Sequence, residues 1–174
     1  MLIELNMRPM LEADIDDEYV SWFVNSDGHL NFYTGSGRVF DKNTILEDFK
    51  KGLETRFWFY YIIEVEGKKI GNVKVGPIDL KNKTSDLVCF IGDREYLGKG
   101  LASKAISIAS EIAFNNHDIR RLHGGMYASN IPSIKAYLKA GWIVEANLKG
   151  YYLVAGEPVD RISVAYLNNK YFEN

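Results

Sequence analysis

The 174-residue sequence predicts one α/β (α+β) domain, residues 1–174, in which a mixed sheet of about seven strands carries four helices packed on both faces. Hydrophobic patterns with a period near 2 and near 3.6 alternate along the whole chain, without a repeat, a low-complexity segment or an interdomain linker. At the centre, residues 86–103 pass from an apolar strand pattern through a glycine turn into a helix pattern. With 47% apolar residues, the chain can enclose one sizeable core.

The first third of the chain is predicted to supply a short strand and two helices. Residues Leu2–Leu5 alternate weakly as a strand. An acidic first turn at Asp14 opens a helix to about Asn25, and Asp41 or Asn43 caps a second helix. The polar, glycine-containing and aromatic loop 26–38 lies between them, and loops of this length are usually functional or mobile.

The rest of the chain alternates further strands with two more helices. The aromatic and β-branched run Phe57–Val65 is the strongest strand pattern in the sequence. One helix starts at Leu101, and the other has Asn130 as its N-cap and Gly141 as its C′ residue. The remaining predicted strands are 70–75, which ends at Gly76-Pro77, 84–91, 122–128, 143–154 and 159–167.

The central turn, Gly98-Lys99-Gly100, is a candidate anion site. Glycines let the backbone approach a ligand, and the first turn of the following helix offers N–H groups at the positive end of the helix dipole. The same glycines could instead simply end a loop. The spacing matches neither the triphosphate nor the dinucleotide signature. The predicted buried stripe of the helix is Leu101, Ala105, Ile108 and Ile112, with Ala102, Ala109 and Ala113 beside it.

Charge and cysteine usage exclude several classes of protein. The net charge of −2, spread without long runs of one sign, gives no reason to expect nucleic-acid or membrane partners. No apolar run approaches the roughly 18 residues of a membrane span. No signal-peptide pattern opens the chain, so a cytoplasmic location is expected. The single cysteine, Cys89, lies in an apolar strand and should have a raised pKa, and the three histidines lack metal-ligand spacing, so no metal site is expected.

The central turn resembles the coenzyme A signature of the GNAT superfamily of acyl-CoA-dependent N-acyltransferases, Q/R-x-x-G-x-G/A. The signature maps onto residues 97–102, with matching Gly100 and Ala102 and with Leu97 in place of the glutamine or arginine. Main-chain N–H groups hold the diphosphate in this family, so the resemblance still implies a coenzyme A site. The words EYLGKGLAS are most similar to the branch that contains ribosomal-protein N-terminal and amino-sugar acetyltransferases.

A second passage, residues 128–142, resembles the GNAT motif N-x-x-S/A-x-x-x-Y-x-x-x-G-F/W through Asn130, Ser133 and Tyr137. Seven residues make nearly two helical turns, so Asn130 and Tyr137 should share a face roughly 10 Å apart along the axis, within reach of one ligand arm. By periodicity alone, Tyr137 reads as a core aromatic. The resemblance instead implies that Tyr137 protonates the departing thiolate. A phenol pKa of about 10 and a thiol pKa of about 8.5 are close enough for that transfer.

The resemblance also implies the shape of the site. The sheet should splay between its fourth and fifth strands, 84–91 and 122–128, with the arm of acetyl-CoA lying between them like an added strand. A backbone N–H from Val88 to Phe90 is the expected donor to the oxyanion. The residues expected to bind the cofactor are Val88, Cys89, Phe90, Ile91, Leu97, Gly98, Lys99, Gly100, Leu101, Ala102, Ser103, Asn130 and Ser133.

The general base is left open by the sequence. Several relatives carry a glutamate five residues before the motif asparagine, where this chain has Gly125. Asp86, at the start of the fourth strand, is the nearest carboxylate in sequence and is the candidate catalytic base beside the candidate acid Tyr137. Other candidates are His29, Tyr33, Tyr127 and a water chain. Without a strong base, an amine of pKa roughly 8 is an easier acceptor than lysine, near 10.4.

The predicted function is transfer of an acetyl group from acetyl-CoA to a primary amine, most readily that of an amino sugar, often nucleotide-linked. A protein N-terminal amine is the alternative acceptor, and a non-catalytic acyl-CoA-binding module is the alternative class of protein. The acceptor should meet the loop 26–38 and the hairpin around Tyr151 and Tyr152. A homodimer is an open expectation for assembly.

Overall fold

The computed structural model describes residues 4–24 and 40–172. Its seven-stranded sheet has the order β1-β2-β3-β4-β5-β7-β6. Neighbouring strands are antiparallel except for the parallel pair β4 and β5. The predicted mixed sheet is therefore confirmed. The strands are β1 (Leu5–Pro9), β2 (Phe59–Val65), β3 (Lys68–Asp79), β4 (Thr84–Ile91), β5 (Arg121–Tyr127), β6 (Ile143–Val154) and β7 (Glu157–Leu167).

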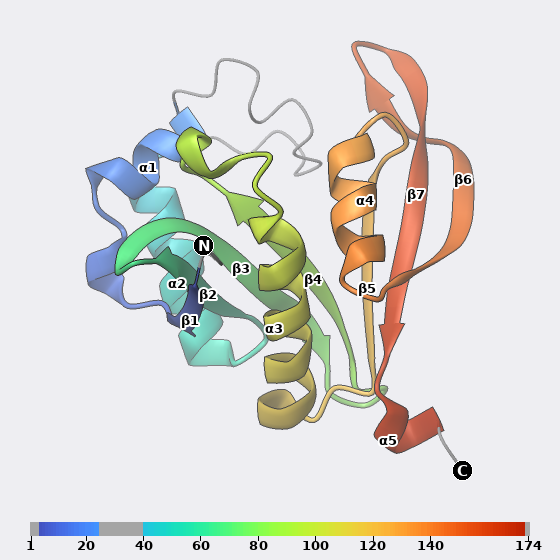
Figure 1. Cartoon of the computed structure of the whole chain (residues 1–174), viewed down its shortest axis with the longest axis horizontal. Coiled ribbons are helices and arrows are strands. Elements are labelled where there is room, and N and C mark those ends of the chain that lie inside the picture. The colour runs from blue at the N-terminus through green and yellow to red at the C-terminus, as the bar shows by residue number, and fades with distance from the viewer. Residues whose placement is uncertain (1–3, 25–39, 173–174) are drawn as a thin grey trace.

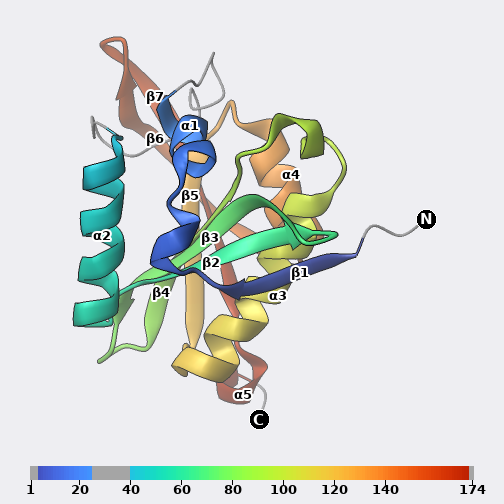
Figure 2. The ribbon, with the colours of Figure 1, turned by 90° about the vertical axis from the view of Figure 1, so that its left-hand side faces the viewer.

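Helices cover both faces of the sheet, as the sequence predicts. Figure 2 shows α2 on one side of β2, β3 and β4, and α3 and α4 on the other side. The helices are α1 (Asp17–Val24), α2 (Lys42–Thr55), α3 (Leu101–His117), α4 (Ile131–Lys139) and α5 (Asn169–Phe172), with short 3-10 turns η1 (Glu12–Asp14) and η2 (Arg94–Tyr96). The short α5 was not predicted, because one turn leaves no periodic pattern in the sequence.

Each face of the sheet has its own buried cluster. Ile63 belongs to the cluster under α3 and α4, whereas its neighbour Ile62 belongs to the cluster formed with α1 and α2. Adjacent strand residues point to opposite faces, so an uninterrupted apolar run is what a strand covered on both faces requires. This is why Phe57–Val65 is the strongest strand pattern in the sequence, although β2 itself begins at Phe59.

The first strand lies further along the chain than the sequence predicts. The expected strand was Leu2–Leu5, of which residues 2 and 3 lie outside the described residues, and β1 runs from Leu5 to Pro9, paired with β2 from Val65 to Tyr61. Pairing with β2 rather than local alternation sets these limits. Pro9 is tolerated because β1 is an edge strand, where one missing N–H breaks no second ladder.

Two other predicted boundaries are also wrong. The first helix was expected from Asp14, but the carboxylate of Asp14 accepts hydrogen bonds from Arg8 and from the backbone N–H of Leu11, and α1 starts only at Asp17. The strand 70–75 was expected to end at Gly76-Pro77, but β3 continues through that dipeptide to Asp79. Side-chain hydrogen bonds between Asp14 and residues just before it determine the first boundary, and pairing of Ile78 and Asp79 with β4 determines the second.

The buried face of α3 is also rotated from the predicted stripe. Ile108 and Ile112 are only partly buried, whereas Ala109 and Ala113 are fully buried beside Ala105. The three alanines, spaced four residues apart, therefore lie at the centre of the buried face, with Ile106 buried beside them.

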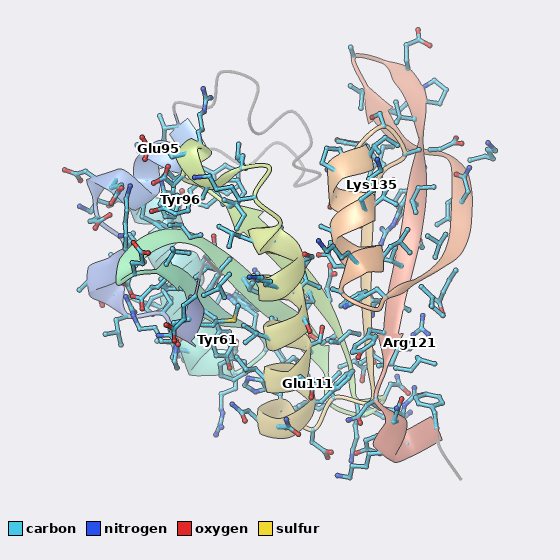
Figure 3. The ribbon with its side chains drawn as sticks, in the orientation of Figure 1. Tyr61, Glu95, Tyr96, Glu111, Arg121 and Lys135 are labelled. Carbon is cyan, nitrogen blue, oxygen red and sulfur yellow. The ribbon has the colours of Figure 1, made fainter. Side chains whose placement is uncertain are left out.

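The parallel pair β4 and β5 separates along its length. Pairing covers only Thr84–Asp86 against residues 121–123, although β4 stays paired with β3 as far as Ile91 and β5 with β7 as far as Tyr127. Figure 1 shows the resulting opening between β4 and β5, with α3 and α4 on its two sides. In Figure 3, Arg121 lies at the paired end and Lys135 on α4 near the open end. The predicted splay is thus present.

Candidate active site

A tyrosine from α4 reaches into the opening between the two parallel strands. The Tyr137 hydroxyl donates a hydrogen bond of 2.6 Å to the carbonyl oxygen of Leu87, the first β4 residue beyond the pairing with β5. The ring is 5% exposed and packs edge-on against Trp142, 4.8 Å between centroids. Burial raises the pKa of Tyr137 well above 10, and the charges of Cys89 and Asp86 act in the same direction. At neutral pH the hydroxyl therefore keeps its proton, and in this buried position it is a weaker acid than an ordinary phenol, so its transfer to sulfur depends on the charge that builds on the leaving thiolate.

The open edge of β4 presents alternate backbone groups to this tyrosine. Because the Leu87 carbonyl faces the opening, the backbone of Cys89 faces it too, whereas Val88 and Phe90 pair with Lys74 and Asn72 of β3. The Cys89 N–H acts as a donor to the Tyr137 hydroxyl. Of the three N–H groups predicted as oxyanion donors, Cys89 is the one on the open edge. Its thiol is buried beside Ala102, and burial raises the thiol pKa to about 12, as expected for an inert side chain.

The glycine turn leads into α3 at the neighbouring end of the opening. Gly98 and Gly100 have φ of 72° and 74°, in the left-handed region that favours glycine. Gly100 is the N-cap of α3, and no side chain caps the helix. A Cβ at Gly98 would meet nothing within 4 Å, and one at Gly100 would meet only the Nζ of Lys139, at 3.8 Å. The turn is thus open to solvent, with a lysine ammonium beside it.

These features fit the diphosphate of coenzyme A. Uncapped N–H groups at the start of a 17-residue helix favour an anion, and the nearby ammonium of Lys139 adds positive charge. Leu97 is 44% exposed, so the side chain that replaces the usual glutamine or arginine faces solvent. Lys99 lies over the ring of Tyr96, 5.0 Å from its centroid. Residues 98–103 would therefore hold the diphosphate mainly by backbone groups.

Asn130 has a structural role that the sequence also predicts. Its side-chain oxygen accepts a hydrogen bond of 3.2 Å from the backbone N–H of Ser133, which caps α4. Contact with the cofactor, for which both residues were also proposed, would have to use the amide nitrogen of Asn130 or the hydroxyl of Ser133. That contact stays a prediction.

Asp86 lies where the two parallel strands part, paired with His123 of β5. Its carboxylate accepts a hydrogen bond of 2.9 Å from the N–H of Leu87. Burial raises the pKa of Asp86, and the charges of His123, Arg161 and Lys74 oppose that shift. A carboxylate with a raised pKa beside the opening has the properties of a general base. The other candidates His29 and Tyr33 lie outside the described residues, as does the loop 26–38.

A cavity of about 450 Å³ lies on the sheet face covered by α1 and α2. Val88 and Phe90 of β4 line it, so it adjoins the strand whose other edge faces the opening. The side-chain oxygen of Asn72, a residue that is 6% exposed, is buried there without a hydrogen-bond partner among the described residues. Other lining residues are Tyr19, Phe23, Glu47, Asp48, Lys51 and Lys74. Sequence reasoning missed this cavity, because Asn72 and Lys74 alternate with valines as on an ordinary solvent-facing strand.

A sheet splayed at its parallel pair, a glycine turn before a helix and a buried tyrosine at the opening together define a GNAT-type acyltransferase domain. Residues 4–143 match the family model described as acetyltransferase (GNAT) domain, so the chain belongs to that family. Acetyl-CoA is the cosubstrate of the family.

Named relatives fall into two groups. The chain is 26% identical over 111 residues to spermidine N(1)-acetyltransferase of Escherichia coli K12, a match that covers 64% of this chain and only 59% of the relative. The fold is similar to that of spermidine N-acetyltransferase from Vibrio cholerae, solved with CoA and spermine (TM-score 0.83, 18% identity, 97% of this chain and 98% of that chain). It is also similar to that of ribosomal-protein-S5-alanine acetyltransferase from Vibrio fischeri (TM-score 0.82, 20% identity, 98% and 97% covered).

The described residues, 4–24 and 40–172, also bear on the expectations for membranes and metals. No helix in these ranges combines the length and the apolar character needed to cross a bilayer. Within the same ranges, no three histidine, cysteine, aspartate or glutamate side chains lie close enough together to hold a metal ion.

Proposed function

We propose that this protein transfers the acetyl group of acetyl-CoA to the primary amine of a small acceptor, an amino sugar in particular. The observation that carries the proposal is the Tyr137 hydroxyl in the opening between β4 and β5, next to a solvent-exposed glycine turn. The diphosphate would lie at the turn and the acceptor in the cavity against Val88 and Phe90. Each substrate would then have its own side of the sheet.

The side chains around the opening supply the steps that acyl transfer needs. Acetyl-CoA, when bound, supplies a thioester whose carbon–sulfur bond breaks as a bond forms between its carbonyl carbon and the amine nitrogen. The N–H of Cys89, which donates to the Tyr137 hydroxyl in this structure, would stabilise the oxygen that gains charge once that hydroxyl turns to the leaving sulfur. Tyr137 gives its proton to the leaving sulfur, and Asp86 accepts the proton that the amine loses. Asp86 shares its strand face with Val88 and Phe90, which places it on the cavity side.

The charges in the cavity favour a hydroxylated acceptor over a polycation. Lys51 and Lys74 line the cavity together with Glu47 and Asp48. Asp48 is occupied, because it accepts hydrogen bonds of 2.6 Å from the Tyr60 hydroxyl and 3.4 Å from the Lys74 ammonium. A sugar could use these donors and acceptors through its hydroxyl groups while its ring packs on the aromatic wall.

A polyamine is the second candidate acceptor, because two of the named relatives are spermidine acetyltransferases. A protein N-terminal amine is the third, since the Vibrio fischeri neighbour is named for a ribosomal protein. The homodimer and the cytoplasmic location also stay predictions.

An acceptor panel separates these candidates. Release of free thiol from acetyl-CoA would be measured with amino sugars, nucleotide-linked amino sugars, spermidine and peptides with free N-termini. We expect the highest kcat/KM for an amino sugar. A higher value for spermidine or a peptide would contradict the acceptor, and tight binding of coenzyme A without turnover of any amine would identify a non-catalytic module instead.

Asn72 provides a test of the acceptor cavity. Replacing Asn72 with leucine should raise the melting temperature, because a buried polar atom without a partner is removed from a nearly isosteric site. The same change should raise the KM of the acceptor by about tenfold if the amide contacts it, about the loss of one hydrogen bond. Steady-state kinetics and thermal unfolding on one sample check both. An unchanged acceptor KM in a stabilised variant would place the acceptor elsewhere.

Asp86 provides a pH test. An amine of pKa about 8 is about one-tenth neutral at pH 7, so loss of its base should lower kcat/KM by at most about tenfold there. The effect of Asp86→Asn should therefore disappear near pH 9, where the amine is already neutral. A deficit that persisted unchanged at pH 9 would contradict the role of base.

The effect of Asp86→Asn on folding stability can also be predicted. Because the pKa of Asp86 is raised in the folded protein, ionisation of Asp86 weakens folding as pH rises through that pKa. Asp86→Asn should therefore be more stable than the wild type at neutral pH, with the difference shrinking below about pH 4.

Asp118 is the control, for which the opposite change in stability is expected, since hydrogen bonds from Lys83 and Tyr171 lower its pKa to about 2. Asp118→Asn should be less stable at neutral pH, and the loss should fade toward pH 2. Melting temperatures across pH check both.

A further inference from the structure

Arg161 of β7 is a partly buried cation that forms no ion pair with a carboxylate of the described residues. Its Nε is buried and has no hydrogen-bond partner among residues 4–24 and 40–172. The guanidinium instead lies over the ring of Tyr151 of β6, 4.9 Å from the centroid. Arginine stays charged at any pH that the protein meets, and it presents five N–H donors in a rigid fork. The partly buried guanidinium therefore keeps N–H donors that could bind a ligand.

The guanidinium lies beside the opening between β4 and β5. A Cβ on Gly125 of β5 would be 2.0 Å from the Nε and 2.2 Å from the Cζ of Arg161, so the guanidinium occupies the space that only glycine leaves. The adjacent Gly124 lies against the Leu87 carbonyl, the acceptor of the Tyr137 hydrogen bond, with 3.6 Å between that oxygen and an ideal Cβ. The guanidinium of Arg161 thus lies where a side chain at position 125 would otherwise begin.

The guanidinium also lies on the side from which the acceptor would approach. Leu122 and Met126 are buried in the cluster under α3 and α4, so Gly125 faces the opposite side of the sheet. Asp86 faces that same side, and Arg161 is close enough for its charge to act on the Asp86 carboxyl. The proposed base and this cation therefore lie on the same side of the sheet.

We propose that Arg161, held by Tyr151 in the space left by Gly125, binds an anionic group, a carboxylate or a phosphate, on the amine acceptor. A planar guanidinium pairs with either anion through two parallel hydrogen bonds, and such an ion supplies the partner that the buried Nε lacks. The ring of Tyr151 fixes the plane of the fork. This inference rests on the proposed function and narrows its acceptor to an amine that carries negative charge, which disfavours spermidine.

Matched acceptors test the subsite in the intact protein. The set would be glucosamine, which has no anion, glucosamine 6-phosphate and UDP-glucosamine, which carry phosphate, and glucosaminuronic acid, which carries a carboxylate. We expect a lower KM for at least one anionic acceptor than for glucosamine. Whether the phosphate or the carboxylate acceptors show the larger decrease in KM identifies the anion. Arg161→Gln should raise that KM about 30-fold, as for loss of a charge-assisted pair, with the kcat, the KM for glucosamine and the Kd for coenzyme A unchanged.

Two further variants separate binding from folding. Gly125→Ala keeps the arginine but displaces the end of its flexible side chain, so it should raise the same KM, and the double variant should add little to either single change. Arg120→Gln removes the same charge at the paired end of β5 and should leave every KM unchanged. Melting temperatures of all variants within a few degrees of the wild type would show that folding is intact.

Failure of this inference differs from failure of the proposed function. If the wild type acetylates amines but Arg161→Gln changes the KM of neutral and anionic acceptors equally, or changes neither, the anion subsite is wrong while the transferase stands. If the wild type acetylates no amine at all, the proposed function is wrong and the subsite is rejected with it.

Discussion

Replacing Tyr137 with phenylalanine should lower kcat by about 100-fold or more, the effect of losing a general acid, while the Kd for coenzyme A changes little. The hydroxyl is the group whose proton the leaving sulfur needs, and burial keeps that proton in place across the working pH range. The diphosphate would be held at Gly98 and Gly100, on a different element, so cofactor binding does not depend on the hydroxyl. Single-turnover kinetics and calorimetry with coenzyme A measure the two quantities separately.

Tyr137→Phe also removes a buried hydrogen bond, so stability has to be separated from catalysis. The Leu87 carbonyl would lose its partner, which costs about 1–3 kcal/mol of folding free energy. Tyr61→Phe is the matched control, because Tyr61 is equally buried and its hydroxyl forms a hydrogen bond of 2.7 Å with the Nε2 of His117, away from the opening. It should lower stability by a similar amount and leave kcat unchanged. Similar kcat values for both variants would make Tyr137 a core residue.

The parts of the site that the sequence predicts are those encoded locally. The turn at Gly98 and Gly100 and its helix lie in one short stretch, and the spacing from Asn130 to Tyr137 is fixed by helix geometry. Strand alternation predicts which residues of β4 share a face. Each of these features needs only a few neighbouring residues, so periodicity and turn chemistry suffice to find them.

The parts that the sequence does not predict depend on strands that meet in space. Arg161 covers Gly125 only because β7 pairs with β5 in a register that sets Arg161 beside Tyr127. The sequence shows a missing glutamate at position 125 but not what fills the gap. Asn72 likewise becomes a buried polar group only because α1 and α2 cover its face of β3. Register and layer packing are properties of the whole sheet, and no local pattern carries them.

The start of β1 and the buried face of α3 differ from the prediction for another reason. Here a local pattern exists, but it predicts the wrong residues. Ile108 and Ile112 are more apolar than alanine, yet Ala105, Ala109 and Ala113 are the more deeply buried residues of α3.

Replacing both Gly98 and Gly100 with valine should weaken coenzyme A binding by about 100-fold. Both residues have positive φ, and a left-handed conformation costs an L residue roughly 1–2 kcal/mol. Two valines would therefore introduce strain of about 3 kcal/mol. The backbone would relieve this strain by turning the N–H groups away from the diphosphate. The matched control is Gly67→Val with Gly156→Val, at φ of 78° and 84° in two strand turns where an added Cβ meets nothing within 4 Å. Both pairs should lose similar stability, but only the first should lose affinity in calorimetry with coenzyme A. Equal affinities for the two pairs would show that the turn before α3 does not hold the diphosphate, and the acetyl thioester would then have no defined path to Tyr137.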